Sequence, residues 1–98
     1  MKYKLVVKPK AEQDAKDAAL WYNNKREDLG NEFLLAIEAQ INAIHRNPNQ
    51  FQIIYNSIRR ALIARFPYGI FFIVEKNTIY VLAILHTFRN PQNWKNRK

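Results

Sequence analysis

The sequence predicts an α+β domain in which two helices pack on one antiparallel sheet. In the first half of the chain, residues 11–25 and 31–46 repeat apolar side chains at helical spacing. In the second half, residues 61–66, 68–75 and 78–86 are instead rich in β-branched and aromatic residues, as strands are. Helices and strands that occupy separate parts of a chain are typical of α+β domains.

The size and composition of the chain limit what it can be. Its 98 residues suit one domain, so residues 1–98 are predicted to fold as a single unit. The absence of cysteine excludes disulfides and thiolate metal sites. The apolar run at residues 5–7 is shorter than the core of a signal peptide, and no run approaches the ~20 apolar residues of a membrane helix. We therefore expect a cytoplasmic protein with no membrane partner.

Residues 2–7 are predicted to form a short strand that leads into the first helix. Pro9 follows this strand, and proline is well tolerated in the first turn of a helix. Acidic side chains near the helix start, including Asp14, favour the positive end of its dipole. One face of this helix carries small and aromatic residues, namely Ala11, Ala15, Ala18, Ala19 and Tyr22.

The second helix is predicted from Asn31 or Glu32 to Arg46, after a break at residues 28–31. The short connection indicates an antiparallel helical hairpin. His45 lies late in this helix, where a partly positive ring suits the dipole, so we interpret it as structural. The apolar stripe of the helix consists of Phe33, Leu34, Ile37, Ile41 and Ile44.

The three strands of the second half are predicted to form an antiparallel meander, after a connector at residues 49–58. Lys76-Asn77 suits a tight hairpin between the last two strands. Residues 78–85 are nearly all apolar, which indicates a central strand buried on both faces. The N-terminal strand should join one of these three, but neither its partner nor its direction follows from the pattern.

The positive charge of the chain is concentrated in the second half. Residues 1–56 carry eight Lys/Arg and seven Asp/Glu, whereas residues 57–98 carry eight Lys/Arg and one acid, Glu75. The second half therefore has a net charge of +7, which would attract nucleic acid or an acidic protein. The alternative is a surface charge that serves only solubility.

A basic cluster in the second half offers candidate functional residues. If the strands pair as hairpins, Arg65 and His86 could approach at one edge of the sheet, with Arg89 following. Arginine binds phosphate and histidine transfers protons near neutral pH, so this set could cleave RNA, although a second acid or base is not obvious. The candidates for target or nucleic-acid contact are Arg59, Arg60, Trp94, Lys95 and Arg97.

Structural alternatives compete with these roles. His86 could simply cap or pack the end of its strand, and Trp94 could hold the C-terminus on the core. Two histidines cannot make a three-ligand zinc site, and two glycines leave no phosphate-binding loop, so we expect no metal and no cofactor.

The ordered motifs of the second half resemble the ParE/RelE toxin superfamily of type II toxin–antitoxin systems. The stretch from Arg65 to Gly69 reads R-F-P-Y-G, which is similar to the family's R-x-F-P-Y strand. The stretch from Val81 to Trp94 is similar to its V-x-A-V-x-H-x-x-R-x-P-x-x-W ending. The order of strand, helical hairpin and meander also resembles this fold over essentially the whole chain.

The resemblance implies a growth-arresting toxin, of a kind associated with plasmid stabilisation, that a cognate antitoxin neutralises. Such antitoxins typically wrap a helix and an extended segment around the toxin's helical hairpin and sheet. The C-terminal motif is more similar to ParE-like members, which inhibit DNA gyrase. The alternatives are a RelE-like ribosome-dependent mRNA endoribonuclease, in which Arg65, His86 and Arg89 would be catalytic, and a basic nucleic-acid-binding module.

Overall fold

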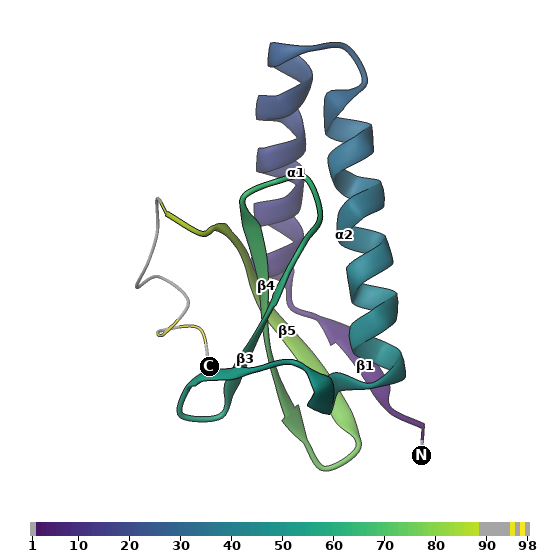
Figure 1. Ribbon diagram of the computed structural model, residues 1–98, viewed down its shortest axis with the longest axis vertical. Helices are drawn as coiled ribbons and strands as arrows, with labels where there is room; N and C mark the ends of the chain where they lie inside the picture. Colours follow the sequence, from purple (N-terminus) through teal and green to yellow (C-terminus); the bar gives the residue numbers. More distant parts are fainter. Residues whose placement is uncertain (1, 89–94, 96, 98) are drawn as a thin grey trace.

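The computed structural model describes residues 2–88, Lys95 and Arg97. Two antiparallel helices stand beside one sheet and project past its end (Figure 1), so the predicted α+β architecture is confirmed. The elements in chain order are β1 (Lys4–Val7), α1 (Pro9–Lys25), α2 (Leu29–Arg46), a 3₁₀ turn (Pro48–Gln50), β2 (Ile53–Tyr55), β3 (Ile58–Leu62), β4 (Tyr68–Glu75) and β5 (Thr78–His86).

The helical hairpin is tighter than the sequence predicts. The second helix begins at Leu29, ahead of the predicted start at residues 31–32, and Asp28 turns the chain with a left-handed φ of 64°. Gly30 is therefore inside the helix rather than in a break. A Cβ atom at Gly30 would lie 2.2 Å from the carbonyl oxygen of Ala19, so this glycine permits close contact of the two helices.

The sheet has the strand order β1-β5-β4-β3-β2. The N-terminal strand pairs with β5 in parallel, with Lys4 opposite Thr78 and Val7 opposite Val81. This pairing answers the question that the sequence pattern left open. It also places β5 between two neighbours, and most of its side chains are buried, as predicted for a central strand.

The first strand of the predicted meander is displaced. The sequence pattern placed it at residues 61–66, whereas β3 covers Ile58–Leu62 and a further short strand, β2, precedes it. Arg65 has a left-handed φ of 73°, which is incompatible with an extended strand at that point. The apolar residues Ile63 and Phe66 are still buried, but they pack in the main core from a loop.

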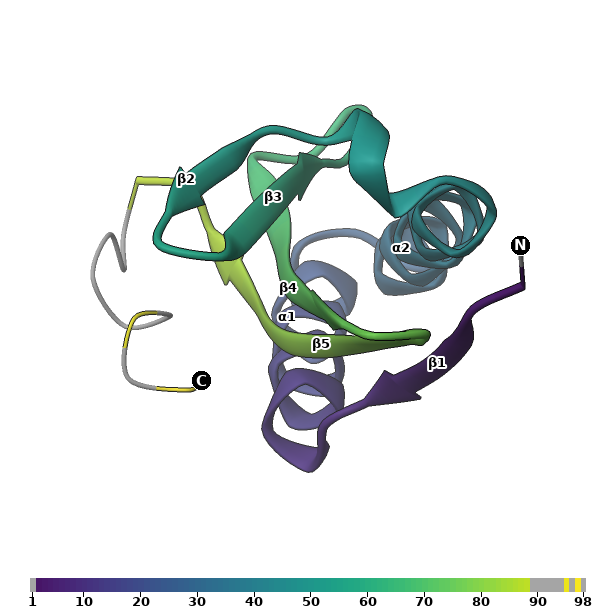
Figure 2. The ribbon, with the colours of Figure 1, turned by 90° about the horizontal axis from the view of Figure 1, so that it is seen from below.

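The sheet contributes side chains to two separate buried clusters. The main core lies between the sheet and the helices and includes Phe33 and Phe72. A second cluster, formed by other side chains of the sheet, includes Ile58 of β3 and Phe71 of β4. Figure 2 shows the sheet strongly twisted, with β2 and β3 turned across β4 and β5. A register shift at Phe71 and Phe72 in the β4–β5 pair accompanies this twist.

Candidate functional site

Two of the predicted binding arginines are adjacent on β3 and have different environments. Arg59 donates hydrogen bonds to the carbonyl oxygens of Phe51 and Asn49, at 2.6 and 3.5 Å, and so fastens the segment before β2. The stem of Arg60 packs over Gly69, whose missing Cβ would lie 3.2 Å from Arg60 Cγ. In the described part of the chain, no carboxylate pairs with the Arg60 guanidinium.

Arg65 connects the loop after β3 to the helical hairpin. Its guanidinium donates to Glu32 Oε1 at 2.7 Å, and Arg26 contacts the other oxygen of Glu32 at 3.3 Å. The hydrogen bond from Arg65 lowers the pKa of the Glu32 carboxyl below its usual 4.5, while partial desolvation opposes that shift and the charge of Arg26 adds to it. Arg65 is thus half of an exposed ion pair.

His86 is the last residue of β5 and lies opposite Tyr68 of β4 in the sheet register. Their rings are 5.3 Å apart and nearly perpendicular. The Nδ1 atom of His86 accepts the backbone N–H of Phe88 at 3.1 Å, so the proton of the neutral ring is on Nε2. Such a hydrogen bond is what the structural alternative predicts, in which the His86 ring caps the end of its strand.

A cleft of about 240 Å³ adjoins His86. Helix α1 forms one wall and the paired ends of β4 and β5 form the other, and the polar groups in it include two carboxylates, an imidazole and a phenol. These are groups that can exchange protons. The lining residues are Asp14, Asp17, Ala18, Trp21, Tyr68, Ile84, Leu85 and His86.

Arg65 and His86 take different partners rather than each other in the contacts described above. Arg65 engages the start of α2, and His86 engages Tyr68 and the turn after β5. The segments that carry them are neighbours, because the backbone N–H of Thr87 donates to the carbonyl oxygen of Pro67 at 2.8 Å, but each side chain has its own partner within the chain. Their catalytic roles stay predictions, and Arg89, the third member of that set, lies outside the described residues.

The C-terminal candidates contact the body of the protein. Lys95 Nζ lies 4.6 Å from the centre of the Tyr55 ring on β2. Arg97 forms an ion pair with Asp14 of α1, and only 18% of its side chain is exposed. Arg97 is therefore partly buried in an internal contact, whereas Lys95 is placed at the edge of the sheet. Trp94 lies outside the described residues.

Asp14 is a residue whose role sequence reasoning missed. The carboxylate accepts the backbone N–H of Ile84 at 3.0 Å, in addition to pairing with Arg97. A signal was present, because Asp14 falls within the apolar stripe of α1, between Ala11 and Ala15 and one turn before Ala18. A carboxylate at such a position needs a polar partner across the interface.

Exposed apolar side chains collect on the outer half of the helical hairpin. Leu20 of α1 and Leu35 of α2 are 64% and 65% exposed, and Trp21 and Leu34 are also well exposed. We call Leu20, Leu34 and Leu35 the hairpin patch, because Trp21 instead lines the cleft at His86. Large exposed apolar groups gathered on one element often mark a surface that binds another protein.

Residues 2–88, 95 and 97 support neither a metal site nor a membrane-spanning helix. No group of three or more His, Asp or Glu side chains there is arranged to hold a metal ion. Neither helix in that part of the chain is long and apolar enough to cross a membrane.

Comparison with known proteins identifies the family. A family profile described as "ParE toxin of type II toxin-antitoxin system, parDE" matches residues 5–91. Among solved structures, a chain from "Chromosomal ParDE TA system from P. aeruginosa" superposes with a TM-score of 0.78 at 19% identity, over 87% of this chain and 96% of that one. A comparison with curated protein sequences gives no match. Because the family profile covers most of the chain, this protein belongs to the ParE toxin family of type II toxin–antitoxin systems.

Proposed function

We propose that this toxin arrests growth by binding and inhibiting DNA gyrase, without catalysis of its own, and that a cognate antitoxin neutralises it by covering the hairpin patch. The observation that supports the non-catalytic part is that Arg65 and His86 each already have a partner within the chain. Arg65 is paired with Glu32 at 2.7 Å, and the Nδ1 atom of His86 is occupied by the N–H of Phe88. The Arg65 guanidinium is therefore neutralised by a carboxylate of the same chain, where a nuclease would need it to hold the charge of a phosphate.

The positive half of the chain supports a macromolecular target. The net charge of +7 on residues 57–98 would steer the protein to DNA-bound gyrase or to an acidic antitoxin. Arg60 on β3 and Lys95 beside β2 are the described basic residues best placed for such contact. The strands β3 and β2 are neighbours at one edge of the sheet, so the two charges lie at that edge. The cytoplasm, where gyrase and its DNA are found, is the proposed location of action.

A supercoiling assay with purified gyrase and relaxed plasmid tests the proposed target. The wild-type protein should inhibit supercoiling, and His86→Ala should inhibit it to a similar extent because the ring is not catalytic. An Arg60→Ala variant should be weaker, with Lys16→Ala as a control that removes the same charge from α1. Normal supercoiling at excess wild-type protein would refute gyrase as the target.

A second candidate function is ribosome-dependent cleavage of mRNA. The cleft beside His86 favours it, because the ring lies next to the Tyr68 phenol and close to the carboxylates of α1. Primer extension on messages from a translating bacterial extract separates this function from the first. New cut sites that disappear with both His86→Ala and Arg65→Ala would support cleavage, and intact messages would exclude it.

The third alternative, a nucleic-acid-binding module without toxicity, makes a different prediction. Its affinity for duplex DNA should fall steeply with salt, because phosphate contacts release counterions. Expression of the protein alone should then leave growth unchanged. Growth arrest that a small acidic protein from the adjacent reading frame relieves would support the toxin assignment instead.

A further inference from the structure

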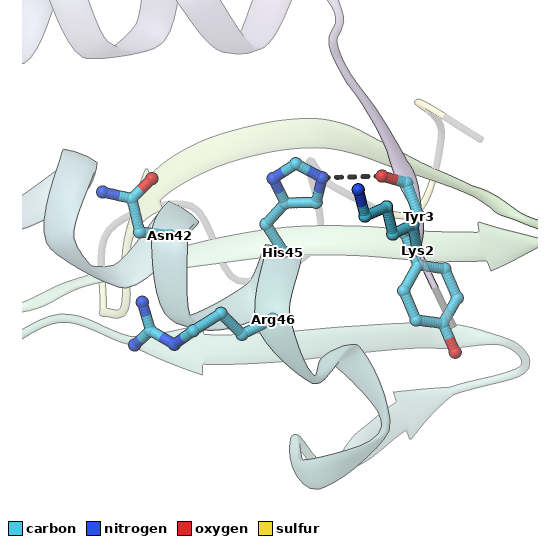
Figure 3. Close-up of a pocket in the computed structure, with 5 residues that line it drawn as sticks. All are labelled: Lys2, Tyr3, Asn42, His45 and Arg46. Atoms are coloured by element: carbon cyan, nitrogen blue, oxygen red, sulfur yellow. Dashed lines mark hydrogen bonds between the residues drawn. The ribbon is translucent and has the colours of Figure 1, made fainter.

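A basic pocket lies on the first half of the chain, apart from the cleft at His86. It has a volume of about 450 Å³ and is formed between the segment that precedes β1 and the last turns of α2 (Figure 3). Its lining residues are Lys2, Tyr3, Asn42, His45 and Arg46, and it shares none of them with the cleft at His86.

The charges of this pocket are of one sign. Lys2 and Arg46 are basic residues, His45 adds an imidazole, and no carboxylate is among the lining residues. In the described part of the chain, neither Lys2 nor Arg46 forms an ion pair. Glu38, one turn before Asn42 on α2, does not line the pocket. An unpaired positive site of this kind attracts an anion.

The His45 ring is held in a defined orientation. Its Nε2 atom lies 2.7 Å from the carbonyl oxygen of Tyr3, and because a carbonyl only accepts, Nε2 must be the donor. Figure 3 shows Nδ1 on the opposite side of the ring, the side on which Asn42 lies. The Nδ1 atom therefore faces the part of the pocket that Asn42 lines.

The end of a helix explains only part of this cluster. The last carbonyls of α2 favour cations, which accounts for His45 and Arg46 as stabilising residues of the helix terminus. It does not account for Lys2, which comes from a different segment and lines the same pocket. Two elements thus contribute positive groups to one concave surface.

We propose that this pocket binds a phosphate group, carried either by a nucleic-acid backbone or by a free nucleotide. A guanidinium matches phosphate oxygens with paired hydrogen bonds, and an ammonium and an amide can supply further donors. The volume falls in the range of about 300–1,000 Å³ that is usual for small-ligand pockets, so the phosphate can enter with an attached sugar or base. This proposal does not depend on the toxin's target, because it concerns binding alone.

Calorimetric titration of the folded protein tests the pocket with three probes: inorganic phosphate, a nucleoside 5′-monophosphate and a short DNA duplex. The pocket variant is Lys2→Gln/Arg46→Gln. The matched control is Lys10→Gln/Lys16→Gln, which removes the same charge from the first turns of α1. Circular dichroism checks that both remain folded, as expected for exposed side chains.

Loss of two charge-assisted contacts should weaken phosphate binding by more than about tenfold in the pocket variant and leave the control close to wild type. If duplex binding falls together with phosphate binding, the pocket receives a nucleic-acid backbone. If the pocket variant loses phosphate and nucleotide but keeps the duplex, the source is a free nucleotide. Equal losses in the two variants, or no binding of any probe by wild type, would overturn the proposal.

Discussion

The carboxylate of Asp14 on α1 accepts the backbone N–H of Ile84, in the second half of β5, at 3.0 Å. The parallel neighbour β1 ends opposite Val81, so β5 continues past the strand that would have satisfied its polar groups on that side. Arg97 completes the arrangement, since its guanidinium pairs with Asp14 and lies 3.5 Å from the carbonyl oxygen of Leu82. Side chains thus replace the missing strand along this part of β5.

Removing the Asp14 carboxylate should destabilise the protein strongly. In Asp14→Ala the Ile84 N–H loses its acceptor and the partly buried Arg97 loses its counter-charge, so we expect a loss of about 2–4 kcal/mol in the free energy of unfolding. Urea denaturation measures it. Asp17→Ala is the control, because Asp17 is exposed on the same helix and accepts a hydrogen bond from the exposed Gln13 side chain. Similar losses in the two variants would contradict the assigned role of Asp14.

The two glycines should respond differently to the same substitution. In Gly30→Ala the new Cβ would meet the Ala19 carbonyl oxygen at 2.2 Å, and the helices must separate, which should cost about 3 kcal/mol or more. In Gly69→Ala the nearest atom belongs to the flexible Arg60 side chain at 3.2 Å, so the cost should be at most about 1 kcal/mol. Thermal melting of both variants compares them directly. A Gly30→Ala protein as stable as Gly69→Ala would show that the hairpin is not close-packed at this point.

The Glu32 ion pairs should make stability depend on pH in the acid range. Because the folded-state pKa of Glu32 lies below 4.5, its contribution is present above about pH 4.5 and is lost as the pH falls through the folded value. The difference in urea midpoint between wild type and Glu32→Gln should therefore be largest near pH 7 and shrink below about pH 4.5. Glu38→Gln, on the same helix, serves as the control. A difference that stays constant with pH would argue against the pairing with Arg65 and Arg26.

Periodicity in the sequence predicted most of this fold, and its errors have physical causes. The apolar stripes of the helices and the long runs of β4 and β5 are set by local spacing, so both were recognised. The strand predicted at residues 61–66 was displaced because Ile63 and Phe66 are buried from a loop, and burial alone does not distinguish a loop from a strand. The parallel pairing of β1 with β5 depends on contacts distant in sequence, which no local pattern encodes.

The candidate site was harder to predict than the fold. Composition and motif order drew attention to Arg65 and His86, but their partners depend on tertiary contacts: Glu32 is 33 residues from Arg65. Arg97 was expected to contact a target, whereas its pairing with Asp14 spans 83 residues of sequence. A residue type indicates which chemistry is available, and only the fold decides whether a charge is available to a partner or is already paired within the chain.

The hairpin patch gives the most direct test of the proposed antitoxin surface. Leu20→Asp and Leu35→Asp, made singly, each place a charge where an apolar partner surface should lie, and such contacts commonly contribute about 2–4 kcal/mol to binding. We expect each variant to fold normally, because both side chains are mostly exposed, and to lose about 30-fold or more in affinity for the antitoxin encoded beside it. Asn24→Asp adds the same charge at an exposed polar position of α1 and should bind like wild type. In cells, the leucine variants should remain toxic when the antitoxin is co-expressed, whereas rescue equal to that of wild type would place the antitoxin on another surface.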